Sequence, residues 1–442
     1  MATKTLPAPA WQNLNTPQTL WASLYIIWAL DVLLLAAAIV GAQVHRGAMQ
    51  TIGKDAAPSI IAAQHIKTAL ADMDADAANE LLGAPDQEAY ERHRVEAATK
   101  LIEAAKNITY ADEQKPIVDI QVGMGKYERL VQRARDLHDV NAYSEAARVM
   151  DDELLPRADE LDKVNNRELD KAYNGQSGKS IASVVFLLFT GAALVAALVA
   201  IQKFLNQRMR RILNPMLVLT TLVTLGFVLY TLSVFGAERK DLKVAKEDAF
   251  TSVHALWRAR AVAYAANADE SRYLLDAAHA QEHEQKFQEK AAALALLPSG
   301  TSFARVIEAY RDGRKPAITG YLADELNNIT FEGERYAAIS ALENFGEYLS
   351  IDGEIRSLQR SGKHAEALEL CIRTKAGQSN AVFDQFDQAI GKTLEINQQE
   401  FDKAVARGFS ALSRFEIKAG IAAVIIALLA FFGLLQRIRE YQ

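Results

Sequence analysis

The chain has 442 residues, of which 50% are hydrophobic and 24% charged, and its formal net charge is −6. This acidic balance gives no reason to expect nucleic acid as a partner. A single cysteine, Cys371, excludes a fold that intramolecular disulfides hold together. The hydrophobic residues are concentrated in separate apolar blocks, which predicts a protein that crosses a membrane.

Four apolar runs of roughly 20 residues each are long enough for an α-helix to cross the hydrocarbon core of a bilayer. The runs are residues 20–42, 181–202, 216–236 and 419–435. The first run could instead be a signal peptide, because small residues follow it. Its length, and the single lysine (Lys4) that precedes it, favour an uncleaved membrane anchor.

The loop between the second and third runs indicates how the chain is oriented. This loop, residues 203–215, is short and basic, and it contains Lys203, Arg208, Arg210 and Arg211. By the positive-inside rule it lies in the cytoplasm, together with residues 1–19 and 436–442. The two long polar segments, residues 43–180 and 237–418, then lie together on the extracytoplasmic side.

The first long segment has a helical pattern nearly throughout. Between residues 60 and 81, apolar and alanine side chains recur at spacings of three and four, and no alternating strand pattern occurs. A turn at residues 83–86 ends this helix, and three further helices follow up to residue 180. The first and fourth helices continue into the flanking membrane helices. The pattern therefore predicts an antiparallel four-helix bundle.

The second long segment repeats the first. Asp74-Ala75-Asp76 corresponds to Asn267-Ala268-Asp269 at an offset of 193 residues, and residues 107–110 correspond to 328–331 at an offset of 221. Asn165 corresponds to Asn397 at an offset of 232, so the second copy has gained residues in two places. These matches predict an all-α membrane protein with four transmembrane helices and two extracytoplasmic antiparallel four-helix bundles, arranged as a tandem duplication and an internal pseudo-dimer.

Several strings in the chain resemble known sensory proteins. The segments DADAANELL and LLPRADELDKVNNRELDKA resemble the four-helix-bundle ligand-binding domains of bacterial chemoreceptors and sensor kinases. The tandem arrangement, with KEDAFTSVHALWRARAVAYAANADESRYLL and FDQFDQAIGKTLEINQQEFDKAV, is similar to tetraspanning membrane proteins of actinobacteria. Those proteins work with an amino-acid-binding lipoprotein to control a soluble Ser/Thr kinase. The resemblance implies a multi-pass sensor in the bacterial cytoplasmic membrane.

Unlike ordinary chemoreceptors, the chain shows no HAMP linker, methylated coiled coil or kinase after either bundle. We therefore expect a separate cytoplasmic protein to carry the output, and an extracytoplasmic small ligand or binding protein to supply the input. The arginines Arg208, Arg210 and Arg211 are candidates for the contact with the cytoplasmic partner, although topology also accounts for them.

Two motifs imitate metal sites. His279 and His283 match H-x-x-E-H, the pattern of an inverted zinc protease, but no third ligand is identifiable, so a solvated tip between helices is expected. Asp72, Asp74 and Asp76 imitate the start of a calcium loop. The loop lacks its glycine and its final glutamate, so an exposed helical face is expected. With no nucleophilic grouping either, we expect no enzyme activity, no cofactor and no metal.

One helix of the second segment offers candidates for ligand binding. Trp257, Arg258, Arg260, Tyr264 and Arg272 cluster along it, and an arginine there could hold a carboxylate in bidentate fashion. The alternative is that these are solvated faces with snorkelling side chains. Trp257 and Tyr264 are seven residues apart and share a face, whereas Arg258 and Arg260 are expected to point elsewhere.

Three polar residues have special positions. Asp31 lies near the middle of the first membrane run, where a carboxylate should face protein and not lipid. It could have a structural or interhelical role, contact a partner's basic residue or take part in proton or ion movement. Asn165 and Asn397 precede the second and fourth membrane runs by similar distances. They could be buried polar residues that fix the register of the helices, or they could be surface residues. Possible hydrogen-bond partners of Asp31 in the third run are Thr220, Thr221, Thr224, Tyr230 and Thr231.

The pattern as a whole favours a transmembrane signal sensor. A small shift of a continuous helix would transmit ligand binding to the cytoplasmic side. The alternative is a non-enzymatic structural or accessory subunit of a membrane complex. A transporter is disfavoured, because the predicted spans lack paired charges and broken helices.

Overall fold

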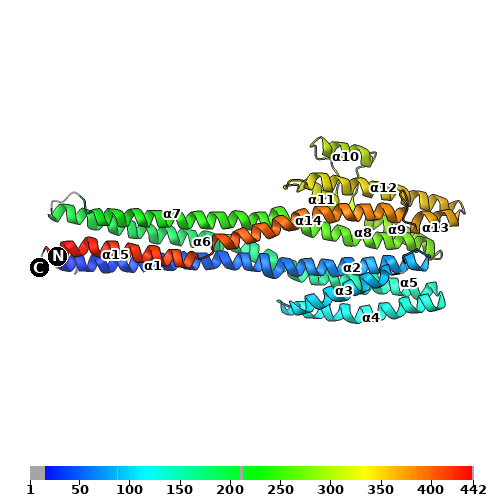
Figure 1. Ribbon diagram of the computed structural model, residues 1–442, viewed down its shortest axis with the longest axis horizontal. Helices are drawn as coiled ribbons and strands as arrows, with labels where there is room; N and C mark the ends of the chain where they lie inside the picture. Colours follow the sequence, from blue (N-terminus) through cyan, green and yellow to red (C-terminus); the bar gives the residue numbers. More distant parts are fainter. Residues whose placement is uncertain (1–14, 87, 210–212, 441–442) are drawn as a thin grey trace, which may run out of the picture. The chain divides into compact units, whose positions relative to one another are not determined.

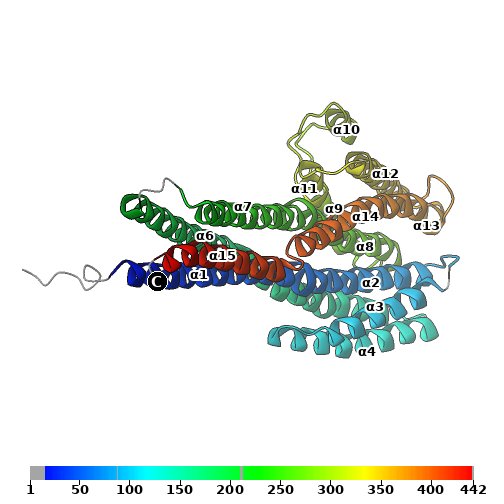
Figure 2. The ribbon, with the colours of Figure 1, turned by 60° about the vertical axis from the view of Figure 1, so that its left-hand side comes forward.

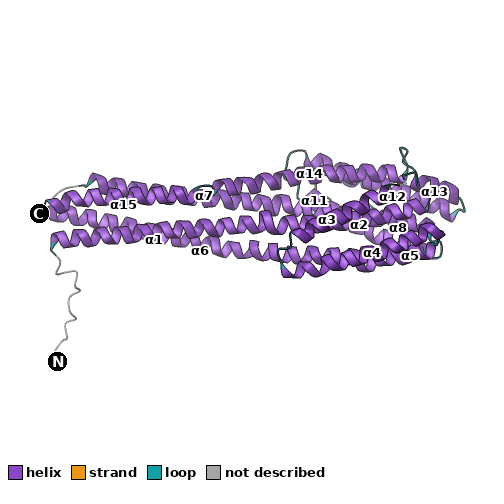
Figure 3. Cartoon of the chain, turned by 60° about the horizontal axis from the view of Figure 1, so that its bottom comes forward, coloured by secondary structure: helices purple, strands orange, loops and turns teal. Residues whose placement is uncertain are grey.

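The computed structural model describes residues 15–86, 88–209 and 213–440. This part of the chain is 87% helical, and no strand occurs in it (Figure 3). The all-α prediction is thus confirmed. The chain divides into two compact units. We call them the span unit (Met1–Gln50, Ala172–Leu242 and Val405–Gln442) and the bundle unit (Thr51–Lys171 and Lys243–Ala404).

The span unit contains four helices that are long and apolar enough to cross a membrane, as the sequence predicts. Its helical segments come from α1 (Thr16–Gln50), α6 (Leu155–Met209), α7 (Pro215–Lys243) and α15 (Phe415–Arg439) (Figure 1). Their outward side chains are apolar, as expected for a surface that contacts lipid. Exposed examples are Val32, Phe189, Leu229 and Val424.

Small residues allow the helices of the span unit to approach closely. A Cβ atom added at Gly41 would lie 2.7 Å from the ring of Phe235, and one added at Gly191 would lie 2.8 Å from Val228. Such close packing stabilises helix association in a membrane, where the hydrophobic effect contributes little because the lipid tails are also apolar. Trp28 of α1 also donates a hydrogen bond to the Ala427 carbonyl of α15, at 3.2 Å.

A buried polar pair joins α1 and α7 in the span unit. His45 Nδ1 is hydrogen-bonded to Glu238 Oε2, and both side chains are essentially inaccessible to solvent. The imidazole Nε2 lies 3.3 Å from the Ser180 hydroxyl. His45 and Glu238 are 193 residues apart, the offset that relates Asp74-Ala75-Asp76 to Asn267-Ala268-Asp269.

The bundle unit contains two groups of antiparallel helices. The first group consists of α2 (Ala57–Leu81), α3 (Ala89–Lys106), α4 (Gln114–Leu137), α5 (Val140–Val149) and the start of α6. The second consists of α8 (Thr251–Leu275), α9 (Ala280–Leu294), α12 (Glu334–Arg360) and α14 (Ser379–Ala411), with the short helices α10 (Phe303–Arg311), α11 (Tyr321–Asn327) and α13 (His364–Ile372). Helices α2 and α8 lie side by side, so each contacts both groups (Figures 1 and 2).

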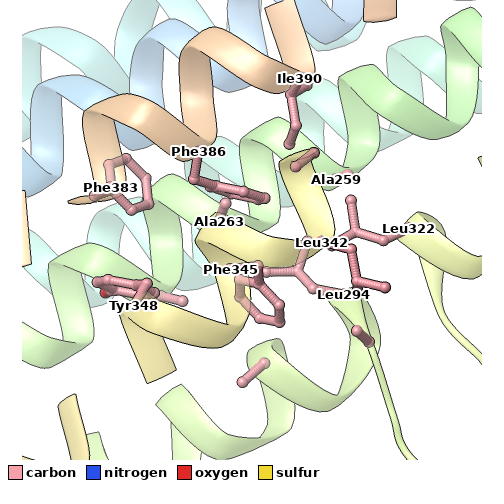
Figure 4. Close-up of a cluster of buried hydrophobic side chains, with 14 of the residues drawn as sticks. Ala259, Ala263, Leu294, Leu322, Leu342, Phe345, Tyr348, Phe383, Phe386 and Ile390 are labelled. Atoms are coloured by element: carbon pink, nitrogen blue, oxygen red, sulfur yellow. The ribbon is translucent and has the colours of Figure 1, made fainter. Parts of the chain in front are cut away.

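The second group has an aromatic core. Phe345 and Tyr348 of α12 face Phe383 and Phe386 of α14, with ring centroids 5.3 Å apart in the pairs Phe345–Phe386 and Tyr348–Phe383 (Figure 4). Burying a phenylalanine contributes on the order of 2 kcal/mol to folding. The core of the first group contains smaller side chains, mainly alanine and leucine.

Corresponding loops of the two groups are built alike. Glu113 Oε2 accepts hydrogen bonds from the backbone N–H groups of residues 109 and 110, at 2.6 and 2.8 Å. Glu334 Oε2 accepts them from residues 330 and 331, at 2.7 and 2.8 Å. These glutamates are 221 residues apart, the offset found in the sequence at this point. Each carboxylate satisfies two backbone donors that would otherwise be unpaired.

The helices that enter the two groups also share a π-helical turn. These turns are Thr51–Ala56, before α2, and Val244–Phe250, before α8. Beyond them, Asn107 donates a hydrogen bond to the Ser59 hydroxyl at 3.2 Å, and Asn328 donates one to the Ser252 hydroxyl at 2.9 Å. A π-helical turn is rare and holds an extra residue in the helix.

Candidate functional site

A cavity of about 390 Å³ lies in the bundle unit, between helices of both groups. Helices α2 and α3 form one wall, and α8 and α14 form the other. Its volume falls in the range typical of small-molecule sites. The polar lining residues include Thr68, Asp72, Asp76, Asn79, Asp86, Arg92, His93, Glu96, Arg260, Asn267, Asp384 and Asp387, and the aromatic ones are His65, Trp257, Tyr264 and Phe383.

The first wall holds a histidine between two carboxylates. His93 of α3 places Nε2 3.1 Å from Asp72 Oδ2 and Nδ1 2.5 Å from Asp76 Oδ2. Asp72 and Asp76 are four residues apart on α2, so they share one face. Among the residues that the structure describes, this triad is the one group of three or more His, Cys, Asp or Glu residues spaced to hold a metal ion.

Burial and mutual repulsion shift the pKa values of this triad. Burial, and then the charge of Asp76, raise the pKa of Asp72 well above its usual value. Burial also raises the pKa of Asp76, although the hydrogen bond from His93 opposes this. Burial disfavours the charged imidazolium of His93, but its hydrogen bond to Asp76 and the charge of Asp72 outweigh that effect, so its pKa is raised.

The expectation that Asp72, Asp74 and Asp76 form an exposed helical face is wrong. Asp72 is 8% exposed and Asp74 is 2% exposed. The physical reason is that α2 packs against α3 on one side and α8 on the other, which leaves little of its surface for solvent.

The second wall brings together three of the predicted binding residues. Trp257, Arg260 and Tyr264 all line the cavity. Arg260 is paired with Asp387 of α14 in bidentate fashion, at 2.5 and 2.7 Å. Its guanidinium carbon lies 5.4 Å from the centre of the Trp257 ring. The prediction that Arg260 points away from Trp257 and Tyr264 is therefore wrong, because spacings of three and seven place all three residues on one helical face.

The remaining predicted binding residues lie elsewhere. Arg258 contacts the Tyr321 ring, with its guanidinium carbon 4.9 Å from the ring centre, and it does not line the cavity. Arg272 is only 1% exposed. It forms ion pairs with Asp74, with Asp269 at 2.8 Å and with Asp151 at 3.4 Å. Arg272 thus connects the two groups of helices from the inside and has no free face for a ligand.

His65, which the sequence did not single out, also lines the cavity. Its ring lies against that of Trp257, with centroids 3.8 Å apart. Burial, followed by the positive charges of Lys100 and Arg260, lowers the pKa of His65 to about 4. The side chain is therefore neutral at physiological pH and adds no positive charge to the cavity.

The cavity and the Arg272 ion pairs involve corresponding residues of the two groups. Three residues that line the cavity are separated by 193 positions from three members of the Arg272 cluster. The pairs are Asn79 with Arg272, Asn267 with Asp74, and Asp76 with Asp269. One location therefore contains a buried guanidinium, whereas the corresponding location contains a cavity.

The other predicted motifs are structural. His279 Nδ1 lies 3.0 Å from Asp276, but His283 is 7% exposed, so the expectation of a solvated tip is wrong for His283. It is covered because α9 packs against α8. Asn165 and Asn397 are both fully buried, which confirms the buried alternative. Asn397 donates a hydrogen bond to Glu334 at 2.7 Å.

Asp31 is 4% exposed, so it faces protein, as predicted. Its Oδ1 has no hydrogen-bond partner among the residues that the structure describes. The hydroxyls of Thr220, Thr224 and Thr231 donate to carbonyls of their own helix instead. Arg208 is exposed near the end of α6, whereas Arg210 and Arg211 lie outside the described residues.

Comparison with known families gives one match. Residues 48–174 match the family model of the actinobacterial sensor domain. No curated protein and no solved structure matches the chain significantly. The matched residues include Asp72, Asp76 and His93, which form the first wall of the cavity, but none of the second wall. The match supports a sensory protein of the kind found in actinobacteria.

Proposed function

We propose that the chain is a membrane sensor that detects a small molecule, or a binding protein loaded with one, outside the cytoplasmic membrane. It relays the signal to a separate cytoplasmic protein and carries out no chemistry itself. By the resemblance noted above, the input would be an amino-acid-binding lipoprotein and the output a soluble Ser/Thr kinase. The match to a sensor domain supports the sensory part of this proposal.

One observation carries the proposal. Two helices that line the cavity, α2 and α8, belong to unbroken helical segments that each contain a candidate membrane span, Thr16–Leu81 and Pro215–Leu275. The third, α14, is separated from α15 by a turn at residues 412–414, where Arg414 has a left-handed backbone conformation. A ligand that contacts these helices differently in two states would shift the equilibrium between the states. The shift would then pass along α2 and α8, which need no intervening joint.

The proposal includes a tandem duplication that forms an internal pseudo-dimer. The similar glutamate-capped loops, the π-helical turns and the contact of His45 with Glu238 at the repeat offset support it. It also places both bundles on the extracytoplasmic side and the basic loop of residues 203–215 in the cytoplasm. In that arrangement Arg208 is available to a cytoplasmic partner.

Amide exchange on the full chain in lipid nanodiscs tests the proposal. A panel of small molecules and of ligand-loaded binding proteins is added, and exchange is followed in α2, α8, α14 and the end of α6. If the chain is a sensor, ligand slows amide exchange in the helices that line the cavity and also changes the exchange rate near Arg208. An accessory subunit, the alternative function, shows no response to any of them and instead co-purifies with a fixed complex.

A further inference from the structure

More acidic than basic side chains line the cavity. Its two arginines are already paired, Arg92 with Asp86 and Arg260 with Asp387, each at 2.5 Å. His93, whose pKa is raised, despite its burial, by its hydrogen bond to Asp76 and the charge of Asp72, is a further basic side chain in the lining, whereas the neighbouring His65 is neutral. The other carboxylates that line the cavity are Asp72, Asp76, Glu96 and Asp384, and His93 is paired with the first two.

A buried hydroxyl also lines the cavity near these carboxylates. Thr68 is 5% exposed, lines the cavity, and its Oγ1 has no hydrogen-bond partner among the described residues. It precedes Asp72 by one helical turn, so both oxygens lie on one face of α2. A buried polar atom without a partner costs free energy unless something else supplies the hydrogen bond. Thr68 and Asp72 together offer acceptor oxygens for a donor that enters the cavity.

The corresponding location in the other group shows what kind of group fits. There, Arg272 places a guanidinium among Asp74, Asp269 and Asp151. The residue 193 positions earlier is Asn79, which is shorter and uncharged. At the cavity, Asp76 thus stands where Asp269 stands beside Arg272, Asn267 stands where Asp74 stands, and the position of the arginine is taken by Asn79.

The lining favours an organic cation over a metal ion. Trp257, Tyr264 and Phe383 line the wall opposite Asp72 and Asp76, and aromatic faces attract organic cations. The volume of about 390 Å³ is far larger than one metal ion needs. Both ring nitrogens of His93 are directed at carboxylates, 2.5 Å from Asp76 and 3.1 Å from Asp72, so neither is free to ligate a metal ion.

We infer that this cavity binds a small organic cation, an amine or a guanidinium compound. Asp72 and Asp76 accept hydrogen bonds from its cationic end, Thr68 accepts a further one, and the aromatic wall covers its carbon chain. The inference rests on the proposed sensor function in one respect, that it names the class of ligand the sensor would detect. Binding to the cavity can be tested without any measurement of signalling.

Binding is measured on the full chain in nanodiscs by calorimetry and thermal unfolding. The cationic probes are n-butylamine, 1,4-diaminobutane and methylguanidine. Butyrate and 1-butanol serve as anionic and neutral controls, and MgCl2, MnCl2 and ZnCl2 test for a metal site. At least one cationic probe should raise the unfolding temperature and protect α2 and α8 from amide exchange, and the controls should not.

Variants locate the binding. Asp72→Asn should lower the affinity for the cationic probe by about tenfold or more, because a charge-assisted hydrogen bond is lost. Thr68→Val, which keeps the shape and removes the hydroxyl, should weaken it less. Asp136→Asn changes an exposed carboxylate outside the cavity, so this variant should bind the cationic probe with the affinity of the wild type. Amide exchange in the absence of probe confirms that each variant is folded.

Three results would overturn the inference. The first is binding of metal ions alone through Asp72, Asp76 and His93. The second is binding of a cationic probe that Asp72→Asn leaves unchanged, and the third is no response to any cationic probe. If a binding protein or an anionic compound still alters exchange at the cavity, the inference fails and the sensor function stands. If a cationic probe binds and exchange near Arg208 does not change, the sensor function fails and the inference stands.

Discussion

Asp74 of α2 and Arg272 of α8 form an ion pair that is buried at both ends, with side chains 3% and 1% exposed. The pair joins the two groups of helices in the bundle unit. Burial raises the pKa of Asp74 to about 6, even though the positive charge of Arg272 acts in the opposite direction. The carboxylate therefore depends on its partner to remain charged inside the protein.

Replacing this arginine should destabilise the fold. In Arg272→Met, Asp74 and Asp269 keep their burial and lose a positive partner. We expect the free energy of unfolding to fall by about 3–5 kcal/mol, as measured by urea denaturation in detergent. The matched control is Arg133→Met, since Arg133 is 60% exposed and pairs with Asp139 at 3.3 Å. Equal stability of the two variants would contradict a structural role for Arg272.

The two glutamate-capped loops allow a paired test. Glu113→Ala and Glu334→Ala each leave two backbone N–H groups without an acceptor, so each should lower the free energy of unfolding by about 2 kcal/mol or more. The second loss should be larger, because Glu334 also accepts a hydrogen bond from Asn397. Both losses are measured by denaturant unfolding.

The conservative changes Glu113→Gln and Glu334→Gln serve as controls for these losses. Glutamine keeps one acceptor oxygen, so most of the stability should be recovered. A large loss at one loop and none at the other would show that the loops are not equivalent.

Glu270 should make stability depend on pH. Burial, and then the negative charge of Asp352, raise its pKa to about 8, although hydrogen bonds from Ser379 oppose this. The folded state thus holds its proton more tightly than the unfolded state, and stability is lost as the pH rises from about 4.5 through 8.

The variant Glu270→Gln removes this loss. Thermal unfolding at pH 9 should show it to be more stable than the wild type by about 1 kcal/mol or more, with the difference shrinking toward pH 5. Glu366→Gln, at a site 60% exposed, should show no such trend. A constant difference at every pH would mean that Glu270 is not the titrating group.

Cysteine labelling tests the proposed topology. Cys371 is fully buried, so the wild type should not react with a membrane-impermeant maleimide. Asp136→Cys should be labelled on intact cells, whereas Arg208→Cys should be labelled only after the membrane is opened. Both positions are exposed in the fold. The reverse pattern would place the bundles in the cytoplasm.

Asp31→Asn tests the buried carboxylate of the span unit. The amide has the same shape without the cost of a buried charge, so we expect unchanged assembly and an unfolding temperature that is equal or higher. Size-exclusion chromatography and thermal unfolding measure both quantities. A marked fall would mean that the ionised carboxylate has an essential partner.

The helices and spans follow from the sequence, because apolar spacing and run length depend on local pattern alone. The burial of Asp72 and Asp74 depends on the contact between α2 and α8, which local pattern does not contain. One signal was present: between residues 69 and 78, apolar residues occupy most of the circumference of α2, more than a helix with one buried face needs, which indicates a helix largely surrounded by protein.

The cavity was harder to predict, because its two walls come from segments that lie far apart in the sequence, α2 and α3 on one side and α8 and α14 on the other. The face shared by Trp257, Arg260 and Tyr264 could have been found from their spacing. His93 belongs to no motif, and nothing in its neighbourhood points to α2. Its role follows only from the packing of α3 against α2.

The contact between His45 and Glu238 bears on how such a chain evolves. A residue that touches its own repeat counterpart lies next to the axis that relates the two halves. In a dimer of identical subunits, that residue would face a second copy of itself, so histidine would meet histidine. Once the halves are joined, a mutation on one side no longer changes the other, and a base can face an acid. On the proposed duplication, this pair could have arisen only after the two copies became free to diverge, and the chain can no longer be divided into two identical subunits without losing it.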